Sequence, residues 1–239
     1  RIIDKDGGTT DYTTTIIVNN GGVNVPPVIV SITNSSPDCG EVEYGDPVTV
    51  TATFTDADAG DTHTAIINWG DGTTSVGTIV ESNGSGTVTG SHPYATGGFF
   101  TITVTLSDNA GGVTSATTDT VIAGVRQLPD GTILIIGTDG RDHVVVHRGG
   151  PGQVKVNLQL NQGGSDGGSD GGSDNFTFNA SSVTGILMYL CEGDDHAVIG
   201  GGSGGSDGGF DIPATIYGEG GDDHLDGGNG KDLLDGGDG

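Results

Sequence analysis

Short runs of alternating apolar and polar residues fill the first half of the chain. Alternation with a period of two is typical of strands that bury one face, and the clusters of Gly, Asp and Asn between the runs are typical of tight turns. No segment shows a helical period of useful length. The pattern predicts an antiparallel β-sandwich over residues 23–123, with strands at 48–54, 64–69, 77–80, 87–89 and 99–106.

The predicted sandwich carries a specific set of motifs. A Trp-Gly-Asp-Gly turn at 69–72 precedes a His-Pro-Tyr triplet at 92–94, the strand at 99–106 and the sequence Ser-Asp-Asn-Ala-Gly-Gly at 107–112. This stretch resembles the PKD family of immunoglobulin-like domains, with Phe100 where the family often has Tyr. The resemblance implies an extracellular spacer or interaction module without catalysis.

A repeat links the first residues of the chain to the end of the predicted sandwich. Residues 4–18 align with residues 108–122, an offset of 104 residues, which is the size of one sandwich domain. Residues 1–22 are therefore predicted to be terminal strands of a preceding PKD-like unit, or of a unit completed by another subunit. The Thr-rich strand at 9–18 could then add to the exposed edge of a neighbouring copy and build a fibre.

Beyond residue 123 the chain becomes richer in Gly and Asp and repeats a short frame. This frame resembles the RTX nonapeptide GGxGxDxUx, in which U is a large aliphatic residue, and its last two full copies start nine residues apart. The copies lie at 137–144, 218–226 and 227–235, with a truncated copy from 236 and a degenerate copy at 192–198. The resemblance implies a parallel β-roll over 124–239 with calcium ions bound between successive turns.

The residue types in the frame suit calcium for physical reasons. Glycines allow sharp turns with positive φ that bring carbonyl oxygens close to a cation, and the Asp at the sixth position supplies a carboxylate. Asp142, Asp195, Asp223 and Asp232 are expected to stack along one edge of the roll. The full set of predicted Ca²⁺ ligands is Asp223, Asp232, Asp142, Asp195, Gly218, Gly220, Asp222, Gly227, Asn229, Gly230, Asp139 and Asp194.

Apolar runs alternate with the predicted calcium turns. Each run is expected to form a parallel rung of the roll, at 132–136, 154–160, 185–190 and 214–217. Two inserts, at 163–174 and 200–209, are rich in Gly, Ser and Asp and are predicted to be flexible linkers. The expected fold is therefore all-β, an antiparallel immunoglobulin-like β-sandwich followed by a parallel β-roll or β-helix with calcium-binding turns.

Other candidate metal ligands fit a structural role better. Asp56, Asp58 and Asp61 lie close together in the sequence, but they lack the Gly and Glu positions of an EF-hand loop, which favours a plain turn. His143 and His147 would be about 13 Å apart on one strand, too far for a single zinc ion.

Three further residues bear on structure more than on chemistry. Trp69 is expected to fill the core of the sandwich rather than to stack on a sugar. Cys39 and Cys191 form either one disulfide in an oxidising compartment or two separate thiols, and the sequence leaves both alternatives open.

The charge of the chain excludes several functions. Its 239 residues include 32 acidic and 7 basic side chains, a net charge of −25, so no basic face is available for binding nucleic acid. No apolar run reaches the length of about 18 residues that a membrane span needs. Low hydrophobicity combined with such a charge favours disorder unless cations neutralise it. The acidity is therefore interpreted as ligand charge for calcium.

Together these patterns predict a secreted or cell-surface protein that is not an enzyme. The expected function is that of a calcium-binding structural or adhesive module. Its expected partners are other copies of itself, in a polymer, or components of the extracellular matrix or cell surface. No HExxH motif occurs, and no nucleophile elbow occurs in its strand–helix context. The alternative is a non-catalytic ancillary region of a secreted hydrolase.

Overall fold

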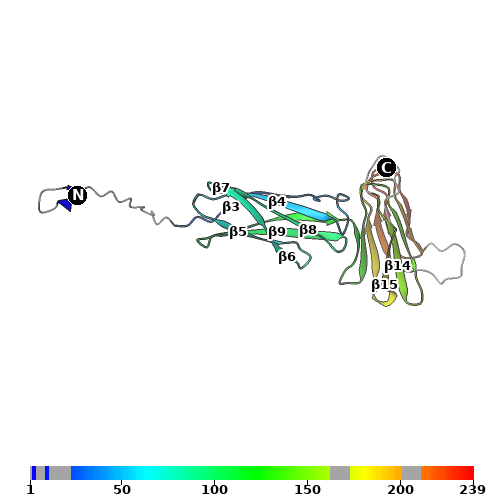
Figure 1. Ribbon diagram of the computed structural model, residues 1–239. Helices are drawn as coiled ribbons and strands as arrows, with labels where there is room; N and C mark the ends of the chain where they lie inside the picture. The colour runs from blue at the N-terminus through cyan, green and yellow to red at the C-terminus, as the bar shows by residue number, and fades with distance from the viewer. Residues whose placement is uncertain (1, 4–8, 11–22, 162–172, 201–210) are drawn as a thin grey trace.

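The protein is built almost entirely from β-strands, which form two successive units (Figure 1). The structure, a computed structural model, describes residues 2–3, 9–10, 23–161, 173–200 and 211–239. Within these ranges the helical structure is the 3₁₀ turn η1 (Ala180–Ser182), and no helix is long and apolar enough to cross a membrane.

The first unit is a sandwich of two four-stranded antiparallel sheets. One sheet has the order β10-β9-β5-β6, and its strands are β10 (Val113–Ile122), β9 (Gly98–Asp108), β5 (His63–Asn68) and β6 (Thr74–Val76). The other has the order β3-β4-β8-β7, and its strands are β3 (Val28–Asn34), β4 (Pro47–Thr55), β8 (Ser85–Pro93) and β7 (Thr78–Ser82). The antiparallel sandwich predicted for this region is confirmed.

Alternation along the strands places every second side chain in the core between the two sheets. The inward-facing residues of β4, all at most 2% exposed, are Val48, Val50, Ala52 and Phe54. Trp69 is completely buried among them, and its indole N–H donates a hydrogen bond to Ser75 Oγ (2.9 Å). Trp69 therefore fills the core, as predicted from its place in the sequence.

The turn after Trp69 is held in place by its own motif residues. Gly70 has a φ of +81°, and a Cβ there would lie 2.7 Å from the Thr101 carbonyl oxygen, so only glycine fits. The ring of His92 stacks on Trp69 at 5.1 Å, and the hydroxyl of Tyr94 donates to the Trp69 carbonyl at 2.8 Å. The motif thus fixes one end of the sandwich.

Three strands of the sandwich, β3, β6 and β10, lie outside the predicted set. The predicted run at 77–80 falls at the start of β7, whereas β6, immediately before Gly77, belongs to the opposite sheet. β3 has no regular alternation, because its register shifts between Ile29 and Ser31 and its face carries several exposed residues. β6 is short and β3 is irregular, whereas β10 is long but rich in Thr and Ser, so the period-two apolar pattern does not reveal these strands.

The first residues of the chain are described at two short strands. β1 (Ile2–Ile3) and β2 (Thr9–Thr10) pair antiparallel with each other. Residues 11–18 of the strand predicted at 9–18 lie outside the described residues. The completion of a second PKD-like unit by residues 1–22 therefore stays a prediction.

The second unit consists of two five-stranded sheets around one core. One sheet has the order β11-β12-β16-β18-β20, and its strands are β11 (Gly124–Gln127), β12 (Thr132–Ile136), β16 (Gly185–Tyr189), β18 (Ala214–Tyr217) and β20 (Leu233–Asp235). The other has the order β15-β14-β13-β17-β19, and its strands are β15 (Asp174–Asn179), β14 (Gln153–Gln159), β13 (His143–Arg148), β17 (His196–Ile199) and β19 (His224–Asp226).

Parallel and antiparallel pairs are combined in both sheets of the second unit. β12, β16, β18 and β20 pair in parallel, and so do β13, β17 and β19. The parallel direction predicted for the run at 154–160 is wrong, because β14 is antiparallel to β13. The tight turn at Gly152, which has a φ of +75°, reverses the chain there.

The two Gly-rich inserts fall mostly outside the described residues. Residues 162–172 and 201–210 are not described, so the linkers predicted at 163–174 and 200–209 stay predictions. The end of the first insert is placed differently, because Asp174 begins β15 and pairs with Leu158.

Both faces of β12 are buried, which explains its unbroken apolar run. Ile133 and Ile135 face the core between the two sheets of the second unit. Leu134 and Ile136 point the other way and pack in a separate cluster with Cys191. This second cluster forms part of the contact with the sandwich.

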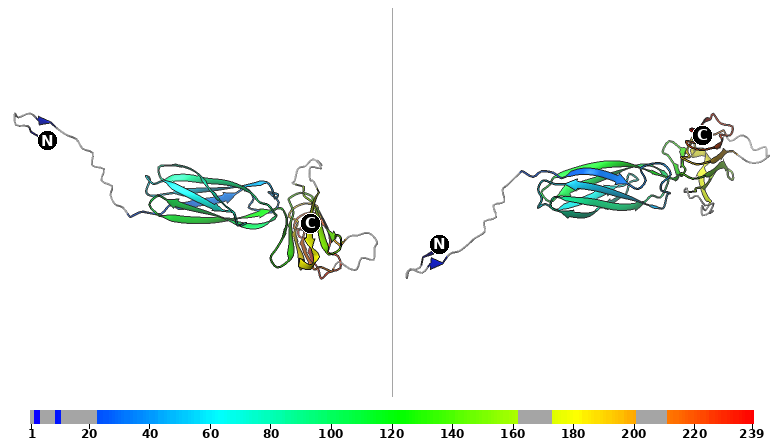
Figure 2. Two further views of the ribbon diagram at one scale, coloured as in Figure 1. Left: turned by 60° about the horizontal axis from the view of Figure 1, so that its bottom comes forward. Right: turned by 90° about the horizontal axis from the view of Figure 1, so that it is seen from above.

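A disulfide between Cys39 and Cys191 joins the two units. Their Cα atoms are 5.8 Å apart although 152 residues separate them in the sequence, which decides between the two alternatives left open for these cysteines. Phe99 of the sandwich meets the ring of Tyr189 edge-on at 5.5 Å on the same side. The second unit consequently sits against one end of the sandwich, as Figure 2 shows.

Candidate metal centres

Three Gly-Asp turns lie along one edge of the second unit, where the chain crosses from one sheet to the other. They connect β12 to β13, β16 to β17 and β18 to β19. Each turn ends on an aspartate, which is Asp142, Asp195 or Asp223. A parallel backbone bridge between Glu192 and Gly220 aligns the second turn with the third. The three aspartates therefore lie in successive layers of the unit.

These aspartates form a carboxylate ladder, a name used below for Asp142, Asp195 and Asp223. The N–H of Asp142 donates to Oδ1 of Asp195 (2.7 Å), and the N–H of Asp195 donates to Oδ1 of Asp223 (2.9 Å). The Oδ2 atoms of Asp195 and Asp223 are buried and have no hydrogen-bond partner among the described residues. Because buried carboxylate oxygens nearly always have a partner, these two atoms are candidate ligands for a cation.

Glycine makes room for two of the three carboxylates, Asp142 and Asp223, at the start of their turns. A Cβ on Gly218 would lie 2.1 Å from Oδ2 of Asp223, and a Cβ on Gly137 would lie 2.5 Å from Oδ2 of Asp142. Any larger residue would push the carboxylate out of the ladder. In these two turns the first glycine is thus required by the aspartate five residues later, whereas the turn of Asp195 has Leu190 at that position.

Burial makes Asp195 and Asp142 hard to ionise. Burial, together with the neighbouring carboxylates of Asp142 and Asp223, raises the pKa of Asp195 to about 8, although the hydrogen bond from the N–H of Asp142 opposes the rise. Burial also raises the pKa of Asp142 to about 6, although hydrogen bonds from Thr138 and Asn161 oppose that rise. A divalent cation beside the ladder would favour the ionised carboxylates.

The donor set of the ladder fits calcium. Ca²⁺ takes oxygen ligands and accepts irregular geometry, and the side chains of Asp195 and Asp223 each offer a free carboxylate oxygen. Asp142 is different because its oxygens already accept hydrogen bonds from the backbone of Thr138 (2.6 Å) and of Asn161 (2.9 Å). Calcium held by Asp195 and Asp223 would neutralise their charge and cross-link adjacent turns.

Asp232 does not share this edge, so the expectation of four aspartates in one column is wrong. It lies between β19 and β20, and because β20 runs parallel to β18, this crossing is at the opposite edge. Its Oδ1 accepts from the N–H of Ala214 (2.9 Å). Gly227, Asn229 and Gly230 belong to the same turn.

The remaining predicted ligands divide between exposed side chains and buried backbone. Asp139, Asp194 and Asp222 are exposed, whereas Gly218 and Gly220 are buried in the ladder turns. The N–H of Asp222 donates to Oδ1 of Asp194 (3.1 Å), which links the rims of the two turns. The structure therefore does not place these three aspartates inside the ladder.

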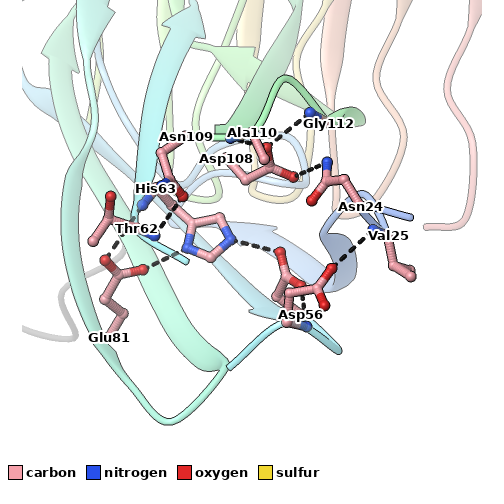
Figure 3. A network of polar contacts seen from close by, with 11 residues as sticks. Asn24, Val25, Asp56, Thr62, His63, Glu81, Asp108, Asn109, Ala110 and Gly112 are labelled. Carbon is pink, nitrogen blue, oxygen red and sulfur yellow. Dashed lines mark hydrogen bonds and ion pairs between the residues drawn. The ribbon is translucent and has the colours of Figure 1, made fainter. Parts of the chain in front are cut away.

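A second acidic group lies in the sandwich and is called the acidic cluster, Asp56, Asp61 and Asp108. Figure 3 shows Asp56 and Asp108 with their hydrogen-bond partners. One carboxylate oxygen from each lies within 4.8 Å of the others, close enough to share a cation. Asp108 is fixed by hydrogen bonds from the N–H groups of Ala110 and Gly112, both 2.8 Å long. Among the described residues, this is the one group of three metal-ligating side chains at such spacing.

The acidic cluster differs in one residue from the group Asp56, Asp58 and Asp61 that lies close together in the sequence. Asp56, Asp58 and Asp61 share one turn, but Asp58 faces away and accepts from the N–H of Val25 (2.9 Å). Asp108, at the end of β9, takes its place. The pairing of β9 with β5 brings Asp108 next to Asp56 and Asp61, and no local sequence pattern predicts that contact.

His63 lies buried beside the acidic cluster between two carboxylates. Its Nε2 is 3.0 Å from Oδ2 of Asp56, and its Nδ1 is 2.6 Å from Oε2 of Glu81. Burial lowers the pKa of His63, but hydrogen bonds to Asp56 and Glu81 outweigh that effect and raise it. The imidazolium form thus balances part of the negative charge that a cation would otherwise have to neutralise.

Known proteins resemble the first unit. The family model of the PKD domain matches residues 24–123. A solved PKD domain of an M14-like peptidase from Thermoplasmatales archaeon SCGC AB-540-F20 is 25% identical, with a TM-score of 0.35, and the match covers 42% of this chain and 98% of that one. The PKD1 domain of Vibrio anguillarum Epp is 20% identical, with a TM-score of 0.31, over 43% of this chain and 99% of that one. No curated protein matches the chain.

Proposed function

We propose that this chain, whose residues 24–123 form a PKD domain, is a calcium-stabilised structural module of an extracellular protein. PKD domains are typically extracellular modules of adhesive or enzyme-associated proteins. The second unit, joined to the domain by a disulfide and an apolar contact, would extend it into a spacer. We assign no catalytic step to either unit.

The observation that carries the proposal is the pair of buried Oδ2 atoms in the carboxylate ladder. Asp195 is 2% exposed, and an unpaired charge at such a position is costly. Calcium bound there would replace repulsion between layers by attraction to a shared cation. Folding and metal binding would then be coupled, because the unfolded chain has no such arrangement of oxygens.

The cellular setting follows from the same features. The disulfide is of the kind that persists in oxidising compartments, and extracellular calcium sites typically bind in the range of about 0.1–1 mM. The net charge of −25 suits a medium in which calcium is plentiful. The proposed location is therefore outside the cell or on its surface.

The proposed partners are matrix or cell-surface components or further copies of the chain. Strand addition through residues 9–18 would make the chain the subunit of a fibre. In the alternative, the chain would serve as a spacer beside the catalytic domain of a secreted hydrolase.

Calcium should raise the thermal stability of the second unit of the full chain. With a dissociation constant of about 0.5 mM, about 5 mM calcium stabilises a site by roughly 1.4 kcal/mol, which corresponds to a rise of about 5–10 °C in Tm. Differential scanning calorimetry in chelator and in calcium measures this shift. Fluorescence of Trp69, the one tryptophan, follows the sandwich separately. Superimposable second-unit transitions in calcium and in chelator would sink the proposal.

A further inference from the structure

Three histidines stack on the outside of the second unit, directly after the three aspartates of the carboxylate ladder. The rings of His143 and His196 are 4.8 Å apart with an interplanar angle of 11°. The rings of His196 and His224 are also 4.8 Å apart, with an angle of 26°. We call His143, His196 and His224 the histidine stack.

Strand register produces this stack. β13, β17 and β19 pair in parallel, with His143 opposite His196 and His196 opposite His224. The next residue of each strand faces the core, as in the fully buried Val144 and Ala197, so the histidines point away from it. His143 and His224 are exposed, which leaves the outer rings accessible to solvent.

The central histidine has a nitrogen without a partner. Nδ1 of His196 is buried and makes no hydrogen bond among the described residues. Its neighbours in the stack present rings rather than carboxylates or carbonyls to it. In contrast, His147 on β13 contacts Asn157 Oδ1 at 2.7 Å and the Arg148 carbonyl at 2.8 Å through its two ring nitrogens.

We propose that the histidine stack binds one divalent transition-metal ion of the zinc type, with His196 as the shared ligand. Neutral imidazole is a preferred ligand of Zn²⁺, Cu²⁺ and Ni²⁺, whereas Ca²⁺ takes oxygen. The site is therefore chemically separate from the carboxylate ladder, although it lies one residue further along each strand. Either His143 or His224 supplies the second imidazole, and water completes the coordination.

The spacing of the stack is close to what such a site needs. Two nitrogens bound to one tetrahedral zinc ion are about 3.4 Å apart, given Zn–N distances of about 2.1 Å. The rings are 4.8 Å apart, so an exposed ring must swing by roughly 1.5 Å about its side-chain torsions. His143 and His224 have the freedom to do this because their side chains are exposed.

A purely packing role for the stack makes a different prediction. Aromatic pairs across neighbouring strands stabilise sheets whatever their ring type. His196→Phe keeps a ring in the stack and removes both nitrogens, so it separates packing from ligation. His147→Asn is the matched control, because it removes a histidine of β13 that is outside the stack.

The test is isothermal titration of the full chain with Zn²⁺ in millimolar calcium, which occupies the oxygen sites beforehand. Wild type should bind one zinc ion, and His196→Phe should lower the affinity at least tenfold, because even the loss of an outer partner of a metal ligand costs about 10–100-fold. His143→Asn and His224→Asn should each weaken binding only slightly, since one imidazole pair remains, whereas the double variant should match His196→Phe. His147→Asn should bind like wild type.

A second readout identifies the ligand atoms. With Cu²⁺ as the probe, electron paramagnetic resonance should show nitrogen ligation in wild type and lose it in His196→Phe. Circular dichroism in calcium checks that each variant is folded, and His196→Asn serves if the Phe variant is not. Equal zinc affinity of wild type and His196→Phe would overturn the proposal, and so would an equal loss in His147→Asn. Neither result bears on the proposed calcium binding by the carboxylate ladder, because the calcium concentration is the same for every variant in this assay.

Discussion

Removal of the Cys39–Cys191 disulfide should lower the free energy of unfolding by about 2–5 kcal/mol. The bond joins partners that are 152 positions apart in the sequence, and long closed loops restrict the unfolded chain most. It also lies at the contact between the two units, beside Leu134 and Ile136. Its loss should therefore weaken the connection between the units as well as their stability.

Equilibrium denaturation of the double variant Cys39→Ser/Cys191→Ser measures this effect. The matched control is oxidised wild type against wild type treated with reductant, because both retain the same atoms in the buried cluster. Limited proteolysis should cut the linking segment near residue 123 faster when the disulfide is absent. Unchanged stability and unchanged proteolysis, with the thiols shown to be free, would mean that the bond has no structural role.

In chelator, the stability of the second unit should fall as pH rises from about 5 to about 8. Asp142 and Asp195 have folded-state pKa values of about 6 and about 8, raised by burial above the value of 3.8 that is usual for a solvated aspartate. Between 3.8 and those values the folded state holds protons that the unfolded state has released. Because these carboxyl groups lose their protons more readily in the unfolded state, raising the pH lowers the free energy of unfolding. The expected loss is of the order of a few kcal/mol.

The variant Asp195→Asn isolates the contribution of the ladder to this pH dependence. Asparagine keeps an oxygen for the N–H of Asp142 but cannot ionise, so the variant should be less sensitive to pH than wild type in chelator. His63 lies in the sandwich and titrates in both proteins, so its contribution cancels in the comparison. Chemical denaturation at a series of pH values supplies the free energies. Parallel pH profiles for wild type and Asp195→Asn would contradict the burial argument.

Calcium should reverse the same pH dependence in wild type. Once the carboxylates bind a cation, the ionised form is the favoured one, and stability at about pH 8 should recover. Asp195→Asn should show little recovery. The contrast between the two proteins in calcium thus complements the contrast in chelator.

The sandwich could be predicted because local pattern and tertiary structure agree there. In β4 and β9 every second residue is buried between two sheets, so the period of the sequence is the period of the fold. β6 has only three residues, too few to show a period, and it was outside the predicted strands for that reason. Short edge strands are specified by their neighbours rather than by their own composition.

The second unit shows where pattern reasoning stops. The run of β14 alternates like its neighbours, but strand direction depends on the length of the connection, and a tight turn at Gly152 makes it antiparallel. The placement of Asp232 depends on which edge each crossing uses. A nine-residue spacing advances the chain by one crossing, so consecutive frames lie at opposite edges.

The candidate sites contain residues that meet only through long-range pairing. Asp108 joins Asp56 and Asp61 because β9 pairs with β5, and Cys39 reaches Cys191 because the two units pack together. The histidine stack had a signal in the sequence, since an Asp-His pair ends each of the three ladder turns. The spacing of His143 and His147 along one strand does not reveal that His143 lies opposite His196 on the neighbouring strand.

Calcium titration of the full chain tests the central claim most directly. Wild type should bind calcium at the carboxylate ladder, and Asp195→Asn or Asp223→Asn should weaken that binding at least tenfold, because each removes a ligand oxygen. Asp222→Asn, which neutralises an exposed neighbour outside the ladder, should bind as wild type does. Identical isotherms for wild type and the two ladder variants would contradict the account.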